Sequence, residues 1–256
     1  MFRKICCIKA ESVPNKSFRR FMSISLLVLC FMSVQVAITA KILVQTGFEE
    51  FSDGKPPKDW EVRGEDIEVT KNTAKTDRQS LAILSGVNDD YVGVFIETDN
   101  SVLSVEFWVY IESGGRSFNF KIGSSDNIAT NNSCIYVNWN AEQVRCFDGA
   151  AWVPIDDFET GKWRHVRFVA HVDKSEFDFY SGEDRNRTLT DKGIKGLPFR
   201  TAPEGSVAKS VSFYVYSIAA PGYVDDLFIS EGDEPVNLAV DAVGKLSTYW
   251  GRLKGY

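Results

Sequence analysis

The stretch from Gly161 to Gly182 constrains the fold of this chain more strongly than any other. Apolar and polar side chains alternate in residues 164–172 and again in 176–180, on either side of Asp173-Lys174. A period of two is typical of a β-strand with one buried face, and two such runs joined by a short turn predict an antiparallel hairpin. We expect the apolar side chains to face a core and the polar ones to face the other way.

The same alternation recurs along the chain in short segments separated by Gly- and Pro-containing turns. We expect fourteen strands, at 42–49, 60–63, 67–70, 80–84, 91–98, 102–112, 117–123, 134–139, 144–147, 152–156, 163–172, 176–180, 209–217 and 223–230. Many short strands without a helical period predict an all-β fold, a two-sheet antiparallel β-sandwich of the jelly-roll type. The charged segment 183–207 is expected to be a connection over the surface.

The first forty residues have the features of a secretory signal peptide. Basic residues precede an apolar run from Phe21 to Ala40 that ends in small residues, which is typical of a cleaved signal. The alternative is an uncleaved membrane anchor, because the run approaches the length that spans a bilayer. We therefore predict a signal peptide at 1–40, a sandwich domain at 41–230 and a C-terminal tail at 231–256, in a secreted or periplasmic protein that has no membrane contact after cleavage.

Charge excludes one class of partner. Beyond residue 40 the chain has 23 Lys and Arg against 34 Asp and Glu, a net charge of −11. An acidic protein repels phosphate backbones, so nucleic acid is not expected as a partner.

Two of the five cysteines lie beyond the signal segment. Cys134 and Cys146 flank the segment SCIYVNWNAEQVRCF, and a hairpin centred near Asn140 would set them opposite one another. An oxidising compartment would then permit a disulfide. The alternative is two reduced thiols.

Four stretches in order carry a resemblance to known proteins: TGFEEFSDGKPPKDW, LSVEFWVYIE, GKWRHVRFVAHVD and YVDDLFIS. Together they resemble the laminin G-like, concanavalin A-like jelly-roll domains of secreted bacterial proteins, and they are similar to the terminal signatures of several carbohydrate-binding modules. The resemblance covers nearly all of residues 42–230. It implies a domain that binds glycans, with catalytic relatives that act on polysaccharides.

The resemblance also implies a structural calcium ion. In similar sandwiches an acid of the first strand and an Asp pair of the last strand hold Ca²⁺, which corresponds here to Glu49, Asp225 and Asp226. Carboxylates brought together at strand ends repel one another unless an oxygen-binding cation lies between them. Asp225 shares the parity of Leu227 and Ile229, which predicts an inward-facing carboxylate. The alternative is that these acids bond turn amides or lie in solvent.

The polar positions of the strands supply a candidate ligand face rich in aromatic rings. Sugars stack on such rings while their hydroxyls bond polar side chains. The alternative is that another layer covers this face. The expected ligand-binding residues are Glu106, Trp108, Tyr110, Asn119, Lys121, His165, Arg167, Asp178, Tyr180, Tyr214 and Tyr216.

Catalysis has weaker support in the sequence. Glu176-Phe177-Asp178 resembles the start of a glycosidase carboxylate motif, but Ser181 stands where the next acid is needed, and a retaining hydrolase needs both carboxylates. We therefore expect a non-catalytic module for a glycan or a cell-surface protein. The alternatives are a structural or adhesive domain, a polysaccharide hydrolase, and a polysaccharide lyase that would use His165, Arg167 and Tyr180.

Overall fold

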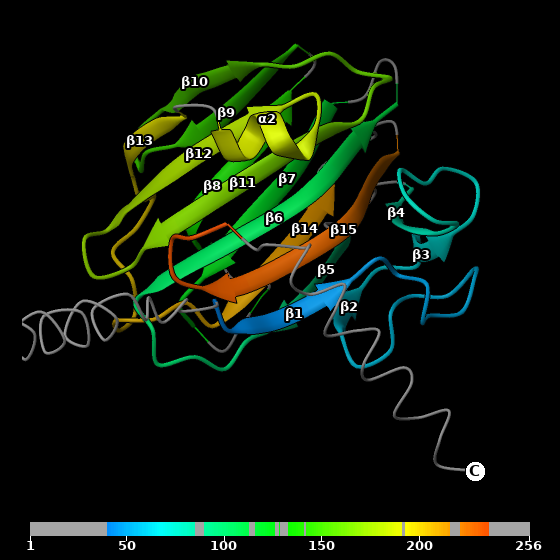
Figure 1. Cartoon of the computed structure of the whole chain (residues 1–256), viewed down its shortest axis with the longest axis horizontal. Helices are drawn as coiled ribbons and strands as arrows, with labels where there is room; N and C mark the ends of the chain where they lie inside the picture. Colours follow the sequence, from blue (N-terminus) through cyan, green and yellow to red (C-terminus); the bar gives the residue numbers. More distant parts are fainter. Residues whose placement is uncertain are drawn as a thin grey trace, which may run out of the picture. The chain divides into compact units, whose positions relative to one another are not determined.

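The chain forms two antiparallel sheets packed face to face, seen in a computed structural model (Figure 1). The structure describes residues 40–84, 90–112, 116–125, 128, 133–140, 142–190, 193–215 and 221–235. Residues 1–39 of the predicted signal peptide, Tyr216, and the tail beyond Pro235 lie outside these residues. The prediction of an all-β antiparallel sandwich is confirmed.

The eight-stranded sheet contains the hairpin of residues 164–182. Its order is β13-β12-β11-β6-β15-β4-β3, and β1 also pairs with β15. The bounds are β13 (Ile194–Pro198), β12 (Glu176–Gly182), β11 (Arg164–His171), β6 (Val102–Ile111), β15 (Gly222–Glu231), β4 (Ser80–Ile83), β3 (Ile67–Thr70) and β1 (Ile42–Thr46).

The seven-stranded sheet has the order β10-β9-β8-β7-β14-β5-β2. Its bounds are β10 (Trp152–Asp157), β9 (Gln143–Phe147), β8 (Ser133–Asn140), β7 (Arg116–Gly123), β14 (Ser210–Val215), β5 (Asp90–Phe95) and β2 (Glu61–Arg63). The strands β7 to β10 follow one another within this sheet and β11 to β13 within the other, whereas the chain crosses between the sheets at every connection from β1 to β7 except that from β3 to β4.

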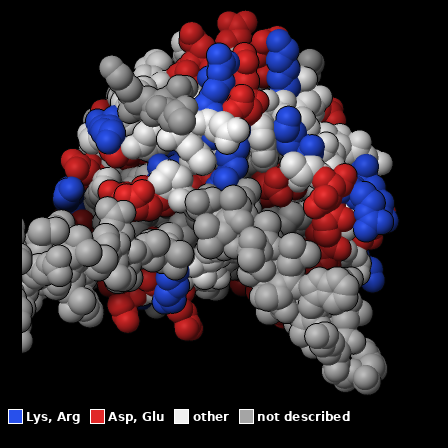
Figure 2. All heavy atoms as spheres, in the orientation of Figure 1, with Lys and Arg blue, Asp and Glu red and all other residues white. Residues whose placement is uncertain are grey.

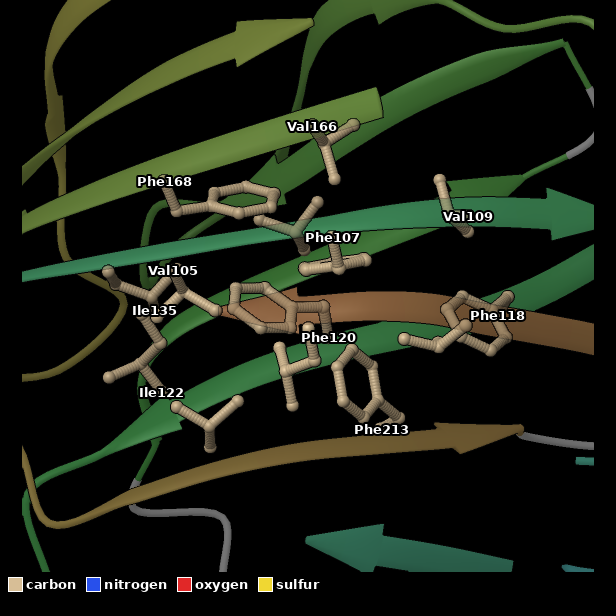
Figure 3. Close-up of a cluster of buried hydrophobic side chains, with 14 of the residues drawn as sticks. Val105, Phe107, Val109, Phe118, Phe120, Ile122, Ile135, Val166, Phe168 and Phe213 are labelled. Carbon is tan, nitrogen blue, oxygen red and sulfur yellow. The ribbon is translucent and has the colours of Figure 1, made fainter. Parts of the chain in front are cut away.

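The core lies between the two sheets, and valine and isoleucine side chains surround a group of phenylalanine rings in it (Figure 3). Phe107 and Phe168 of the eight-stranded sheet meet Phe120 and Phe213 of the seven-stranded sheet. Ring centroids are 4.5 Å apart for Phe120 and Phe168 and 5.0 Å apart for Phe107 and Phe213. All four side chains are fully buried, and each contributes about 1.5–3 kcal/mol through removal of apolar surface from water.

The hairpin at 164–182 forms as its alternation predicts. Phe168 pairs with Phe179 and Ala170 with Phe177 on the core side. Arg167 pairs with Tyr180 and therefore shares with it the outer side of the sheet.

The segment 183–207 differs from the expected plain connection. It holds the short helix α2 (Arg185–Thr190) and the edge strand β13. The Asp184 carboxylate caps α2 by accepting a hydrogen bond from the amide of Arg187 at 2.8 Å. A helix of six residues is too short to show a hydrophobic period, and β13 pairs only with β12 and exposes Ile194, so neither element has a clear sequence pattern.

The predicted disulfide is wrong in this structure, because the hairpin β8–β9 has a different register. Cys146 pairs with Val137 rather than with Cys134, and three residues along a strand amount to about 10 Å. That separation exceeds the reach of a disulfide. Both thiols are buried and free, and burial raises the pKa of the Cys146 thiol to about 11.

Candidate functional site

The predicted ligand residues lie on two different faces of the sandwich. Those on β6, β11 and β12 point outward from the eight-stranded sheet, whereas Asn119, Lys121 and Tyr214 lie on β7 and β14 of the seven-stranded sheet. The outer faces of two packed sheets point in opposite directions. The expectation of one shared face is therefore wrong, and Tyr216 lies outside the described residues.

The outer face of the eight-stranded sheet is covered in its middle. Glu106 and His165 are 1% exposed, Arg167 is 4% exposed and Trp108 is 6% exposed. Helix α2 lies across β11 and β12 (Figure 1), and the turn before β4 brings the Lys75 ammonium to 4.3 Å from the Trp108 ring. The alternative of a covered face therefore describes this sheet.

Buried charges on this face are paired with one another. The Glu106 carboxylate lies 2.9 Å from an Arg185 nitrogen of α2 and 3.6 Å from the Nε of Arg167. Arg167 also donates to Ser104 Oγ at 3.0 Å and to the carbonyl of Asp233. These contacts join the helix and the segment after β15 to the sheet. Figure 2 shows this side of the molecule, with acidic and basic side chains interspersed.

His165 is buried as a neutral ring. Its ring lies edge-on to Trp108 with centroids 5.1 Å apart, and its Nδ1 has no hydrogen-bond partner among the described residues. Desolvation, aided by the positive charges of Arg185 and Arg167, lowers the pKa of His165 to about 3. A ring with so low a pKa is a weak base near neutral pH.

The remaining polar groups of this face also bond one another. Asp178 accepts hydrogen bonds from the Gly196 amide at 3.0 Å and from the Tyr180 hydroxyl at 3.3 Å, and it lies 3.6 Å from His171 Nε2. The Arg167 guanidinium lies 5.3 Å from the Tyr180 ring. Arg167 and Tyr180 are therefore adjacent, but they belong to an internal network.

Two of the three acids expected to hold calcium, Glu49 and Asp225, accept hydrogen bonds from the backbone amides of a turn. Glu49 accepts the amides of Arg78 and Gln79 at 2.8 and 2.6 Å, and Asp225 accepts those of Lys75 and Thr76 at 2.8 and 3.0 Å. In the described part of the chain, no three acidic, His or Cys side chains gather closely enough to hold a metal ion. The three-carboxylate arrangement is thus not formed here, and calcium binding stays a prediction.

Asp225 does not share the inward parity of Leu227. A bulge shifts the pairing of β15 with β6, so that Asp225 pairs with Trp108 and Phe228 with Glu106. Paired residues share a face, so Asp225 points outward under the turn at 75–76. Burial raises the pKa of its carboxyl to about 6.

The seven-stranded sheet presents a different outer face. Two rows of side chains from neighbouring strands run over it, and the first contains Trp152 paired with Phe147 and Tyr136 paired with Lys121. Ring centroids are 5.3 Å apart for Trp152 and Phe147 and 4.9 Å apart for Trp152 and Tyr136. We call the four partly exposed rings Trp152, Phe147, Tyr136 and Tyr214 the aromatic strip.

The second row supplies a polar floor beside the aromatic strip. Arg145 donates to Asn138 Oδ1 at 2.9 Å, Asn138 donates to Asn119 Oδ1 at 2.8 Å, and Asn119 donates to the carbonyl of Tyr214 at 3.2 Å. Both asparagines are at least 97% buried. A satisfied buried network fixes its members in one orientation, so the rings beside it have a rigid neighbour.

Cationic side chains pack onto these rings. Arg145 lies 4.9 Å from the Trp152 ring, Arg200 lies 5.1 Å from Tyr136, and Lys121 lies 4.2 Å from Tyr214. The hydroxyls of Tyr136 and Tyr214 contact one another. The face therefore combines flat apolar surface with hydrogen-bond donors.

Sequence reasoning missed most of this surface. Asn119, Lys121 and Tyr214 were expected, but Tyr136, Asn138, Arg145, Phe147, Trp152 and Arg200 were not. The signal was present for the strand residues, because Tyr136 and Asn138 alternate with buried neighbours in 134–139, as Arg145 and Phe147 do in 144–147. Arg200 follows an edge strand, and its place depends on tertiary contacts alone.

Comparison with known proteins extends the fold assignment. The chain has a jelly-roll fold. A sialidase matches with a TM-score of 0.53 and 13% identity over 77% of this chain, which spans only 19% of the sialidase. A catalytic domain of glycoside hydrolase family 131 from Coprinopsis cinerea matches with a TM-score of 0.51 and 11% identity, over 77% of this chain and 97% of that domain.

The globular domain of T. cruzi calreticulin also matches, with a TM-score of 0.50 and 12% identity over 84% of this chain and 95% of that domain. No protein-family model and no curated protein matches the sequence. At such low identity these likenesses show the fold alone. None of the helices in the described residues is long and apolar enough to cross a membrane.

Proposed function

We propose that the chain is a secreted, non-catalytic module that binds carbohydrate on the outer face of the seven-stranded sheet. The aromatic strip carries this proposal, because four partly exposed rings lie beside a buried Asn119–Asn138 network. Sugar rings stack on aromatic faces while their hydroxyls bond nearby polar groups. Of the three similar structures described above, two are by name a sialidase and a glycoside hydrolase domain, which supports a glycan as the partner.

The state of the ionisable groups on the eight-stranded sheet supports binding without catalysis. On the eight-stranded sheet, Glu106 is paired with two arginines and His165 is neutral and enclosed. General acid–base catalysis needs groups that can reach a substrate and exchange protons near neutral pH. Secretion is proposed from the signal-like segment 1–40.

The test is a glycan array and titration calorimetry with the purified protein and two tryptophan variants. Trp152→Ala should weaken glycan binding about tenfold or more, because it removes a stacking platform. Trp163→Ala is the matched control, since Trp163 packs on Tyr110 at the eight-stranded sheet, and its binding should not change. Equal loss in both variants would remove the assignment to the seven-stranded sheet.

A structural or adhesive domain without sugar binding is the second candidate, with a cell-surface protein as its partner. The covered outer face of the eight-stranded sheet favours it, since Glu106, Trp108 and Arg167 there serve internal packing. No binding to any glycan on the array would favour this candidate. Turnover of a polysaccharide, measured as new reducing ends or unsaturated products, would instead favour a hydrolase or lyase.

A further inference from the structure

The arginines on the two outer faces of the sandwich have different partners. On the eight-stranded sheet, Arg167 and Arg185 both lie within ion-pair distance of Glu106. On the seven-stranded sheet, Arg145 and Arg200 pack on aromatic rings, and neither is paired with a carboxylate of the described residues. The charges of Arg145 and Arg200 beside the aromatic strip are thus available to an anionic ligand, although the chain beyond residue 40 is acidic overall.

Arg145 is held in a fixed place on the aromatic strip. One terminal nitrogen donates to Asn138, which is itself bonded to Asn119. The Arg145 Nε is buried and has no hydrogen-bond partner within the described part of the chain. The side chain is partly exposed and one terminal nitrogen donates one hydrogen bond within the described residues, so the terminal nitrogens, rather than the buried Nε, retain donors for a ligand.

Arg200 is positioned by its backbone as well as by its side chain. Its amide donates to the carbonyl of Cys134 at 2.7 Å, and its guanidinium donates to Ser133 Oγ at 3.4 Å. The guanidinium lies 5.1 Å from the Tyr136 ring and 5.6 Å from the Phe147 ring. Arg145 lies against Trp152, the neighbour of Phe147 in the same row. Arg145 therefore packs on Trp152, and Arg200 packs on the neighbouring rings Tyr136 and Phe147 of the aromatic strip.

We propose that the aromatic strip binds an anionic glycan, a polysaccharide whose sugars carry carboxylate or sulfate groups, with Arg145 and Arg200 as the anion-binding residues. This inference rests on the proposed function and narrows its substrate class. Guanidinium groups bind carboxylate and sulfate oxygens through paired, charge-assisted hydrogen bonds. The rings supply the stacking surface for the sugar, and the arginines favour acidic sugars over neutral ones.

The test is an array that holds acidic glycans together with neutral counterparts of the same backbone. Suitable pairs are polygalacturonate with its fully methyl-esterified form, and dextran sulfate with dextran. We expect binding to the acidic member of a pair, weakened by added NaCl because salt screens charges, and at least about tenfold weaker binding to the neutral member. The two pairs distinguish a carboxylate ligand from a sulfate ligand.

Variants separate this inference from non-specific attraction. Arg145→Gln and Arg200→Gln should each weaken binding of the acidic glycan about tenfold and leave the melting temperature near that of the parent. Arg187→Gln is the control for the loss of one charge, because Arg187 lies on α2 and pairs with Glu183. Arg200→Lys keeps the charge without the planar fork and should recover only part of the binding.

The outcomes decide between the two proposals. Equal binding of neutral and acidic members, lost in Trp152→Ala but kept in Arg145→Gln and Arg200→Gln, would overturn the anionic ligand and leave carbohydrate binding intact. Loss of the same size in Arg187→Gln would also overturn it, since any positive charge would then serve. Binding to no glycan at all would remove the proposed function itself.

Discussion

At the scale of single residues, the outer face of the eight-stranded sheet differs from that of the seven-stranded sheet by its buried ion pairs. Glu106 lies between Arg167 and Arg185 where water does not reach, so its removal leaves two cations without their counter-charge. Removal of one partner from such a buried network is strongly destabilising, because it leaves an uncompensated buried charge. The eight-stranded face therefore uses polar residues to hold its covering segments.

Glu106→Gln should lower the free energy of unfolding by about 3–5 kcal/mol, since breaking one partner of a buried pair strands the other. Urea denaturation measures this change. The matched control is Glu183→Gln, which breaks an exposed pair with Arg187 and should cost less than about 1 kcal/mol. Similar losses in both variants would show that Glu106 is not enclosed as described.

The pH dependence of stability is expected to contain two opposing contributions. The folded pKa of His165 is about 3, below its ordinary value of 6.5, because of burial and the charges of Arg185 and Arg167. The folded protein then binds fewer protons than the unfolded chain, and stability falls as pH drops from 6.5. The folded pKa of Asp225 is about 6, above its ordinary 3.8, because of burial and neighbouring Asp226, so its contribution rises as pH drops from 6.

Between pH 4 and 6 these contributions nearly cancel, each near 1.4 kcal/mol per pH unit. Single variants should separate them. His165→Gln is expected to gain stability relative to the parent as pH falls through this window, and Asp225→Asn is expected to lose it. Denaturant unfolding at several pH values measures both slopes, and slopes of the same sign would contradict the assignment.

At the scale of elements, strand register decides which residues meet. The turn of β8–β9 lies further along the chain than a hairpin centred on Asn140, and this moves Cys134 away from Cys146. The bulge in β15 turns Asp225 from the expected inward side to the outer side. Alternation predicts strands well, but it does not fix register across a turn or reveal a one-residue bulge.

The junction of β1, β15 and the turn at 75–79 is where a calcium ion stays a prediction. Asp225 and Asp226 are adjacent acids, and Asp225 is fully buried. A bound Ca²⁺ would offset their repulsion, so EDTA should lower the melting temperature and excess Ca²⁺ should restore it. No change with either reagent at neutral pH would show that the amides of Lys75 and Thr76 are sufficient.

At the scale of the whole molecule, the sequence predicts two packed sheets but not which strands belong to each sheet. The outward parity of Trp108, Lys121 and Tyr214 is correct within each strand, yet nothing local assigns β6 to one sheet and β7 and β14 to the other. The covering of one face by α2 likewise depends on tertiary packing. The candidate site could therefore be predicted in its residue types and only in part in its location.

The central claim is that a glycan lies on the outer face of the seven-stranded sheet. Hydroxyl-radical footprinting, with and without the polysaccharide that binds most tightly, tests this claim directly. Bound polysaccharide should protect Trp152 and Tyr136 from oxidation and leave Trp163 unchanged. Protection of Trp163 and Tyr110 in place of Trp152 and Tyr136 would contradict the account, because it would put the ligand on the eight-stranded sheet.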